Sequence, residues 1–303
     1  MRKFFLLAAS LVATAFANAQ LKQLTTDQML HGKTEGIINE LPKIISWADD
    51  SHYLMVKTKA AGGDTVIVDA ATGNAMPYKN QNHESSVTVK NNDVFYSDAN
   101  GNEIQLTHDT TEEKNPTLSP DGLKVAFTRS NDLYVIEIAS DKETRITNDG
   151  SDVVYNGWAS WVYYEEILGR ASKYRAFWWS PDSRHIAYMH FDDSNVPMFP
   201  IYSSDGQHGF LEKTRYPKAG DPNPEVSVGI ATIDDAKTVW ADFNAKDDQY
   251  FGTPSWTPDG SALWLQWMNR HQNHLIVYSV NPANGTKKQV YDEQQSTWVV
   301  LTF

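Results

Sequence analysis

The sequence predicts an all-β fold, and three observations support this prediction. A turn phrase built on Pro-Asp-Gly or a close variant recurs four times along the chain, and the residues after it alternate between apolar and polar. Alternation with a period of two is typical of β-strands. Aromatic residues make up 12% of the chain, and such residues are enriched in strands.

The repeated phrase also predicts the architecture. It occurs as "SWADDSHYLMV", "LSPDGLKVAF", "WSPDSRHIAYMHF" and "WTPDGSALWLQWM". Each copy is marked by one aspartate, namely Asp50, Asp121, Asp182 and Asp259. The spacings of 71, 61 and 77 residues leave room for about four strands per unit and for insertions. We therefore expect a partial β-propeller with long, decorated blades, of which about four to five are present. A two-sheet sandwich would also have short strands, but it does not require the phrase at the same place in each unit.

The amino terminus predicts export. Arg2 and Lys3 precede an apolar run at residues 4–16, and small residues follow at Ala17 and Ala19. This is the pattern of a signal peptide, residues 1–19, cut after Ala19. No later stretch reaches the roughly 20 apolar residues of a membrane-spanning helix. We expect an exported protein, periplasmic or extracellular, with no membrane span, whose residues 20–303 form one incomplete amino-terminal propeller domain.

Charge and cysteine content narrow the possible partners. The net charge is −12, and it becomes −14 once Arg2 and Lys3 are removed with the signal peptide. Nucleic-acid binding needs a basic stripe, so no nucleic acid is expected as a partner. The chain has no cysteine, which excludes both disulfides and a lipid-modified cysteine anchor.

No catalytic residue or cofactor is predicted in this chain. The Gly-x-Ser-x-Gly nucleophile motif of α/β-hydrolases is absent, and we expect the chain to be inactive by itself. His271 and His274 form an H-x-x-H pattern, but without a third ligand it indicates a hairpin connection and no metal site. The last residues, "STWVVLTF", resemble the middle of an apolar strand. We therefore expect the chain to be the front part of a longer polypeptide.

One segment does not fit the alternation of predicted strands and turns. In "YNGWASWVYYEEILGR", residues 155–170, Ser160 can cap a helical turn, and Trp161, Tyr164 and Leu168 recur near helical spacing. We expect a short helical insertion. The aromatic residues Trp161, Tyr163 and Tyr164 are candidates for the walls of a pocket.

Glu165 and Glu166 are adjacent in this insertion. Neighbouring residues of a helix point about 100° apart, so two carboxylates can approach one small cation from two sides. A primary ammonium presents three donors, which two carboxylates and one further acceptor satisfy. The alternative is a solvated surface pair, because Arg170 lies four residues after Glu166, where a weak ion pair is common.

The segments around these residues resemble one protein family. They are "RITNDGSDVVYNGWASWVYYEEI" (145–167), "AFWWSPDSRHIAYMHFDDSNVP" (176–197), "YPKAGDPNPEV" (216–226) and "LQWMNRHQN" (265–273). Together they resemble the amino-terminal propeller of the dipeptidyl peptidase IV family, serine exopeptidases related to prolyl oligopeptidase. Before about residue 115 the resemblance is general.

The resemblance implies a two-part enzyme. A propeller gates access and holds the free amino terminus of the substrate. A following α/β-hydrolase domain, which the resemblance implies is absent from this chain, cleaves peptides with Pro or Ala at the second position and releases dipeptides. Glu165 and Glu166 match the glutamates that bind the amino terminus. A homodimer is implied as well.

The sequence departs from the family pattern in three places. Ser160 stands where the family has an aspartate, Tyr164 stands where it has an acid, and its substrate-contacting arginine has no match in residues 80–115. Relatives that release tripeptides share much of the propeller, although the intact glutamate pair favours dipeptides. A different class of function also stays open, namely a stand-alone exported propeller that acts as a binding or scaffold protein without catalytic activity.

Overall fold

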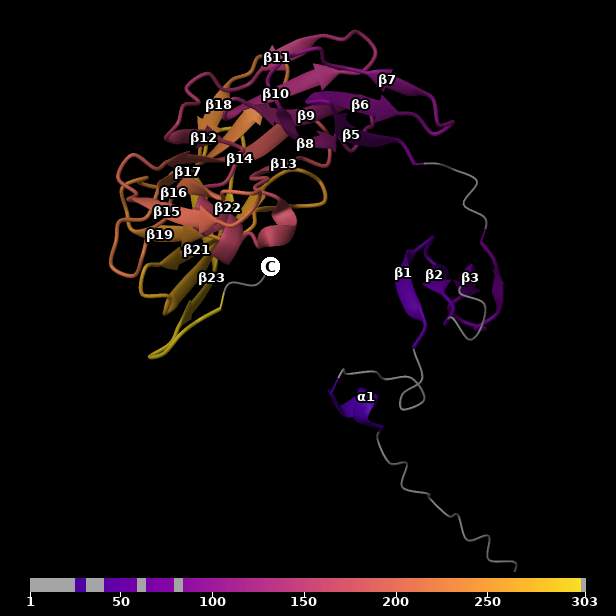
Figure 1. Ribbon diagram of the computed structural model, residues 1–303. Coiled ribbons are helices and arrows are strands. Elements are labelled where there is room, and N and C mark those ends of the chain that lie inside the picture. The colour runs from indigo at the N-terminus through magenta and orange to yellow at the C-terminus, as the bar shows by residue number, and fades with distance from the viewer. Residues whose placement is uncertain (1–24, 31–40, 59–63, 79–83, 301–303) are drawn as a thin grey trace, which may run out of the picture. The chain divides into compact units, whose positions relative to one another are not determined.

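Antiparallel strands dominate the part of the chain that the structure describes (Figure 1). The computed structural model describes residues 25–30, 41–58, 64–78 and 84–300. The predicted signal peptide, residues 1–19, lies outside the described residues. The chain divides into two units, residues 1–81 and 82–303.

The first unit carries a short helix and one antiparallel sheet. The helix is α1 (Thr26–Leu30). The strands follow the chain in the order β1-β2-β3-β4, with β1 (Lys43–Trp47), β2 (His52–Val56), β3 (Thr65–Asp69) and β4 (Ala75–Pro77). Along β3, Val66 and Val68 are buried while their neighbours are partly exposed. This is the alternation expected of a strand with one covered face.

The second unit contains a series of antiparallel sheets. One has the order β5-β6-β7, with β5 (Ser86–Lys90), β6 (Asp93–Ser97) and β7 (Glu103–Gln105). The next has the order β11-β10-β9-β8, with β8 (Glu113–Leu118), β9 (Lys124–Arg129), β10 (Asp132–Glu137) and β11 (Glu143–Arg145). Four-stranded antiparallel sheets of this kind are the blades of propellers.

Two larger sheets and a hairpin complete this unit. One sheet has the order β12-β14-β17-β18 with β13 beside β14: β12 (Val154–Asn156), β13 (Phe177–Trp179), β14 (His185–Asp192), β17 (Glu225–Thr232) and β18 (Thr238–Trp240). The hairpin consists of β15 (Met198–Ser203) and β16 (Phe210–Arg215). The other sheet has the order β19-β21-β22-β23 with β20 beside β21: β19 (Gln249–Phe251), β20 (Ser255–Trp256), β21 (Leu263–Asn269), β22 (His274–Val280) and β23 (Lys287–Gln294). The prediction of an all-β, partial propeller is confirmed.

The repeated turn phrase lies at the same place in four sheets, between β1 and β2, β8 and β9, β13 and β14, and β20 and β21. In each turn an aspartate Oδ1 accepts the backbone N–H of the residue two positions later, a pattern that fixes tight turns. The pairs are Asp49 with Ser51 (2.8 Å), Asp121 with Leu123 (3.0 Å), Asp182 with Arg184 (3.1 Å) and Asp259 with Ser261 (3.1 Å). Asp49 is therefore the aspartate that corresponds to Asp121, Asp182 and Asp259, and the prediction that Asp50 fills this position is wrong by one residue.

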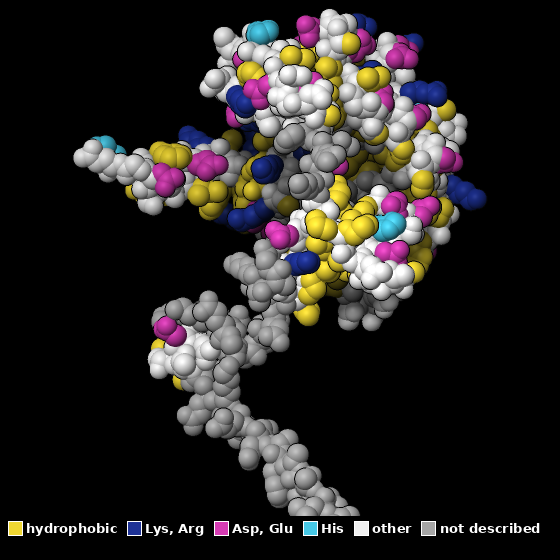
Figure 2. All heavy atoms as spheres, turned by 90° about the vertical axis from the view of Figure 1, so that its right-hand side faces the viewer, with side chains coloured by type: hydrophobic (Ala, Val, Ile, Leu, Met, Phe, Trp, Pro, Cys, Tyr) yellow, Lys and Arg dark blue, Asp and Glu magenta, His cyan; other side chains and the backbone are white. Residues whose placement is uncertain are grey.

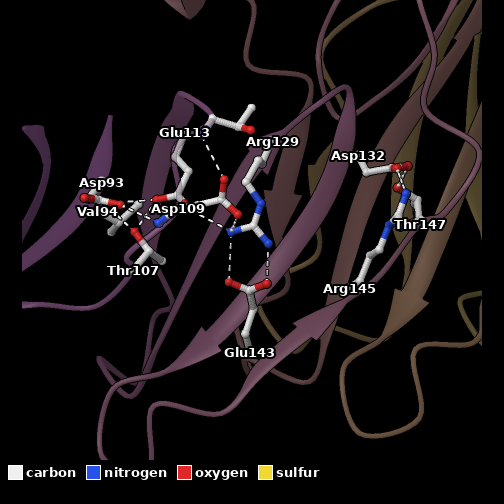
Figure 3. Close-up of polar contacts among 11 residues, drawn as sticks. Asp93, Val94, Thr107, Asp109, Glu113, Arg129, Asp132, Glu143, Arg145 and Thr147 are labelled. Carbon is white, nitrogen blue, oxygen red and sulfur yellow. Dashed lines mark hydrogen bonds and ion pairs between the residues drawn. The ribbon is translucent and has the colours of Figure 1, made fainter. Parts of the chain in front are cut away.

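A second feature, a small network of hydrogen bonds, occurs once in each of two consecutive sheets (Figure 3). The sequence analysis did not detect it. A threonine Oγ1 accepts a backbone N–H from a facing strand, Thr107 from Val94 at 2.8 Å and Thr147 from Leu133 at 3.0 Å. In both sheets the aspartate just before that strand residue, Asp93 or Asp132, accepts a further backbone N–H. The sequence pattern that accompanies this network is "NDV" (92–94) followed by "LTHD" (106–109), and "NDL" (131–133) followed by "ITND" (146–149).

Apolar cores lie between successive sheets of the second unit. One core combines β5 and β6 with β8–β10, a second combines β9 and β10 with β13, β14 and β17, and a third combines β14 and β17 with β19–β22. Representative buried members are Val94 and Phe127, Leu133 and Phe177, and Met189 and Leu265, in the same order. Each sheet is therefore covered by the next, as expected for blades.

The described surface carries both signs of charge. On the face drawn in Figure 2, Lys and Arg side chains are interspersed with Asp and Glu, and hydrophobic side chains gather in places. Among the described residues, no helix has the length and hydropathy that crossing a membrane requires.

A buried ion pair lies within the sheet β8–β11, and its glutamate, Glu113, also accepts the N–H of Val94 on β6 at 3.1 Å. Arg129 at the end of β9 bonds through Nη1 to Glu113 Oε1 at 2.8 Å and through Nη2 to Glu143 (Figure 3). The Glu113 side chain is fully buried and that of Arg129 is 12% exposed. Burial raises the pKa of Glu113, while its hydrogen bonds from Thr107 and Arg129 act in the opposite direction.

We predict that Arg129→Met lowers the free energy of unfolding by about 3–5 kcal/mol, because it leaves Glu113 buried without its counter-charge. Urea denaturation measures this value. The matched control is Lys90→Met, which breaks the exposed ion pair with Glu103 and should cost less than about 1 kcal/mol. Equal losses in the two variants would contradict the importance of the buried pair.

Candidate functional site

The segment that interrupts the strand pattern lies between β12 and β13 and forms a helical turn. Tyr163–Ile167 is a single π-helical turn, in which the N–H of Leu168 donates to the carbonyl of Tyr163 at 2.7 Å. Such turns are rare and occur often at functional sites. The prediction of a short helical insertion that carries the glutamate pair is confirmed.

Ser160 anchors this turn in a way that the sequence did not predict. The residue is fully buried, and its Oγ–H donates to Asp193 Oδ2 at 2.9 Å. Its carbonyl accepts the N–H of Tyr164 at 3.0 Å. The position before the π turn is Val162, and no side chain caps it. Ser160 directly precedes the helical residues that begin at Trp161, as expected of a cap, but its hydroxyl donates to Asp193, just after β14, instead of capping the turn.

Tyr163 holds the other side of the turn in the core. Its side chain is fully buried. The ring contacts Phe191 edge-on at 4.8 Å between ring centroids, and the hydroxyl oxygen accepts the N–H of Phe251 at 3.1 Å. Although Tyr163 was a candidate pocket wall, the structure places it in the core between two sheets.

Tyr164 takes part in a stack of rings. Its ring lies on Tyr174, with centroids 3.7 Å apart, and Tyr174 lies on Trp158 at 4.7 Å. The Lys114 ammonium lies 4.6 Å from the Trp158 ring centroid, a cation–π distance. Lys114 of β8 therefore lies at the Trp158 end of this ring stack. Lys114 is a residue that the sequence analysis did not single out.

Trp161 points to a different hollow. Its ring packs against Tyr216 at 4.4 Å, and it lines a cavity of 270 Å³ together with Tyr155 and Arg215. The three predicted aromatic wall residues therefore lie in three environments: the cavity of 270 Å³, the core and the ring stack.

The two glutamates differ in their surroundings. Glu165 accepts hydrogen bonds from Arg170, from Nε at 2.8 Å and from Nη2. The structure gives Glu166 no hydrogen bond or ion pair with any residue that it describes, and this side chain is exposed. The alternative, an ion pair between Glu166 and Arg170, differs from the structure in its partner, because Arg170 pairs with Glu165.

Glu166 lies at a cavity of 480 Å³, a volume within the usual range of small-ligand pockets. Part of the wall is apolar, from Ile167, Tyr250 and Met268. The polar wall residues are Lys218, Asn223, Arg270 and Gln272. These polar residues fall in "YPKAGDPNPEV" and "LQWMNRHQN", segments that carried the family resemblance but to which the sequence analysis gave no role.

Two of these wall residues are held by further contacts. Asn223 donates through Nδ2 to the Tyr250 hydroxyl at 2.8 Å. Arg270 lies 3.5 Å from Asp248 through Nη1 and donates through Nη2 to the Asp221 carbonyl at 3.3 Å. The cavity therefore presents one unpaired carboxylate, Glu166, beside an apolar wall and a polar rim that includes the cations Lys218 and Arg270. This arrangement suits a ligand that carries one cationic group next to a small apolar part.

The anchor Asp193 is itself electrostatically unusual. Burial raises the pKa of its carboxyl to about 7, although the hydrogen bond from Ser160 and the charge of Arg215 oppose the shift. In the unfolded chain the same group titrates near its ordinary value of about 3.9. Between these values the folded protein keeps a proton that the unfolded chain has lost, so stability falls as the pH rises from about 4 to about 7.

We predict that Asp193→Asn makes the protein more stable at pH 8, by about 2–4 kcal/mol, because the neutral amide avoids ionisation and can still accept from Ser160. The difference should vanish near pH 4. Urea denaturation at a series of pH values measures it, with Asp234→Asn on the exposed turn after β17 as the control. A difference that does not depend on pH would contradict titration of Asp193.

Comparison with known proteins places this chain in a family. Residues 69–302 match the family model described as the dipeptidyl peptidase IV (DPP IV) N-terminal region. The chain is 35% identical over 203 residues to a probable dipeptidyl-aminopeptidase B of Talaromyces marneffei, covering 61% of this chain and 22% of that protein. It is 33% identical over 207 residues to dipeptidyl peptidase 4 of Felis catus, covering 61% of this chain and 26% of that protein. The chain thus spans about a quarter of the length of these curated relatives.

A solved structure shows the same fold. The crystal structure of Porphyromonas gingivalis dipeptidyl peptidase 4 superposes with a TM-score of 0.66 at 23% identity, covering 91% of this chain and 43% of that one. Because the family model matches most of the sequence, this chain belongs to the DPP IV family, in which it corresponds to part of the amino-terminal region.

Proposed function

We propose that this chain is the part of an exported dipeptidyl peptidase IV-like serine exopeptidase that binds the amino terminus of the peptide substrate. The observation that carries the proposal is the unpaired Glu166 carboxylate at the cavity of 480 Å³, next to Glu165. A free peptide amino terminus is a primary ammonium, which a carboxylate binds through short, charge-assisted hydrogen bonds. The apolar wall at Ile167 and Met268 supports binding of the first side chain beside it.

The cleavage itself requires groups from outside residues 1–303. We propose that an α/β-hydrolase domain in the same polypeptide supplies the serine nucleophile, since the chain contains no Gly-x-Ser-x-Gly motif. An ammonium fixed in the propeller sets the distance from the amino terminus to the nucleophile, so cleavage falls a constant number of residues along the peptide. The family relationship supports release of dipeptides that end in Pro or Ala.

Three further properties rest on family membership and on the sequence. Residues 1–19 act as a signal peptide, the enzyme works in the periplasm or outside the cell, and two copies assemble as a homodimer. Amino-terminal sequencing of the secreted protein and analytical ultracentrifugation test these properties. A protein that begins at Met1, or that sediments as a monomer, contradicts the corresponding statement.

The first prediction concerns where activity resides. The full-length product of the gene should cleave Ala-Pro p-nitroanilide, and residues 20–303 alone should not, because the nucleophile is lacking. Release of p-nitroaniline measures both. Hydrolysis by residues 20–303 would show that our assignment of roles is wrong. A gene that ends after Phe303 would instead support the alternative, an exported binding or scaffold protein.

The second prediction concerns the glutamate pair. In the full-length enzyme, replacing both Glu165 and Glu166 by glutamine should lower kcat/KM for Ala-Pro p-nitroanilide at least about 10-fold, mainly through KM, because charge-assisted hydrogen bonds to the ammonium are lost. The control is Glu103→Gln, an exposed glutamate on β7, which should leave the kinetics unchanged. If the double variant behaves like the control, the pair does not bind the amino terminus.

A further inference from the structure

The cavity of 270 Å³ is separate from the one that Glu166 borders. The two cavities have no lining residue in common. The lining of the smaller one, the Asp193 cavity, includes Tyr155, Trp158, Trp161, Tyr174, Asp193 just after β14 and Arg215 at the end of β16. Because its volume lies just below that of common ligand pockets, it has room for one ring with one small substituent.

Two side chains of the Asp193 cavity have buried polar atoms without a hydrogen bond to any described residue. Asp193 is 1% exposed, and its Oδ2 accepts from Ser160, but its Oδ1 has no partner in the described part of the chain. Arg215 donates through Nη1 to the Val196 carbonyl at 2.8 Å, whereas its buried Nε is unpaired among these residues. Buried polar atoms are nearly always hydrogen-bonded. One acceptor and one donor are therefore left for a molecule that enters the cavity.

The backbone around Asp193 holds both groups in place. The Asp193 N–H donates to the Val153 carbonyl at 2.8 Å, and the Asp193 carbonyl accepts the Val196 N–H at 2.9 Å. The Val196 carbonyl in turn accepts from Arg215. One short turn after β14 thus fixes the acceptor and the donor, and little ordering of the protein is needed when a ligand bridges them.

The aromatic walls narrow the class of ligand. The Trp158 and Tyr174 rings stack on each other, and their outer faces are covered by Lys114 and by Tyr164. Only the edges of these two rings are therefore open to a ligand. Ring edges carry partial positive charge and attract the face of another aromatic ring. They repel a cation, as Arg215 does, so the walls favour an aromatic ligand without positive charge.

We propose that the Asp193 cavity is a binding site for a small neutral molecule that carries an amide group on an aromatic ring. The amide N–H donates to Asp193 Oδ1, and the amide oxygen accepts the Arg215 Nε–H. The ring lies against the edges of Trp158 and Tyr174. Ionised Asp193 and Arg215 balance each other in charge, so a charged ligand would leave one buried charge without a counter-charge. This site goes beyond the proposed function and does not depend on it.

Isothermal titration calorimetry of the full-length enzyme with three probes tests the site. At pH 8, where Asp193 is mostly ionised because its pKa is about 7, benzamide should bind with a Kd of about 1 mM, as suits so small a ligand. Benzoate lacks the N–H for Asp193, and protonated benzylamine lacks the oxygen for Arg215, so both should bind at least about 10-fold more weakly. Equal binding of either charged probe, or no binding of benzamide, would show that the site is assigned wrongly.

Two variants locate the bound benzamide. Arg215→Met removes Nε and should weaken benzamide binding at least about 10-fold. Glu166→Gln should leave the affinity unchanged, since Glu166 lines the cavity of 480 Å³ and not this one. The matched control is Arg184→Met, which removes an exposed arginine paired with Asp182, and thermal melting checks that each variant is folded. Loss of binding in Glu166→Gln but not in Arg215→Met would place benzamide in the larger cavity and overturn the proposal.

A crystal of the wild-type enzyme soaked in benzamide provides a check that needs no variant. The amide should lie within hydrogen-bonding distance of Asp193 Oδ1 and Arg215 Nε, with its ring against Trp158. Ordered water alone in the Asp193 cavity, with benzamide bound elsewhere or not at all, contradicts the proposal.

Discussion

The burial of Tyr163 holds the candidate site in place. Its ring packs on Phe191 of β14, and its hydroxyl accepts the N–H of Phe251 on β19. One side chain therefore ties the glutamate turn to two different sheets. Ser160 adds a second tie through Asp193. Both anchoring residues precede Glu165 in the sequence, so the glutamates follow a segment that is fixed to the core. The core, and not a free loop, therefore positions their carboxylates.

Local sequence patterns predicted the strands because a strand and its turn depend mainly on residues that are close together in the sequence. The alternation after each Asp turn follows from one covered face per strand, and the turn itself needs an aspartate whose carboxylate accepts the N–H two residues later. The error at the first turn has the same origin. "WADDS" offers two aspartates, and only the geometry shows that Asp49, not Asp50, accepts the Ser51 N–H at 2.8 Å.

The site was less predictable because its contacts are not local. The sequence placed two glutamates on a helical turn, but the spacing of an ordinary α-helix paired Arg170 with Glu166. The wider π turn and the reversal at Gly169 pair it with Glu165 instead. Ser160 similarly fitted a helix cap, while its partner Asp193 lies 33 residues further along the chain. The spacing of residues 155–170 cannot predict a contact with a residue so far along the chain.

The same ion-pair chemistry serves two purposes in this chain. Arg129 is 12% exposed and lies between two glutamates, one of them fully buried, so it cannot move without leaving charge in the core. Arg170 is 72% exposed and holds one carboxylate at the surface, where water can replace it at small cost. Exposure therefore decides the role of each arginine. The buried arginine holds strands β8, β9 and β11 together, and the exposed arginine can be replaced without endangering the fold.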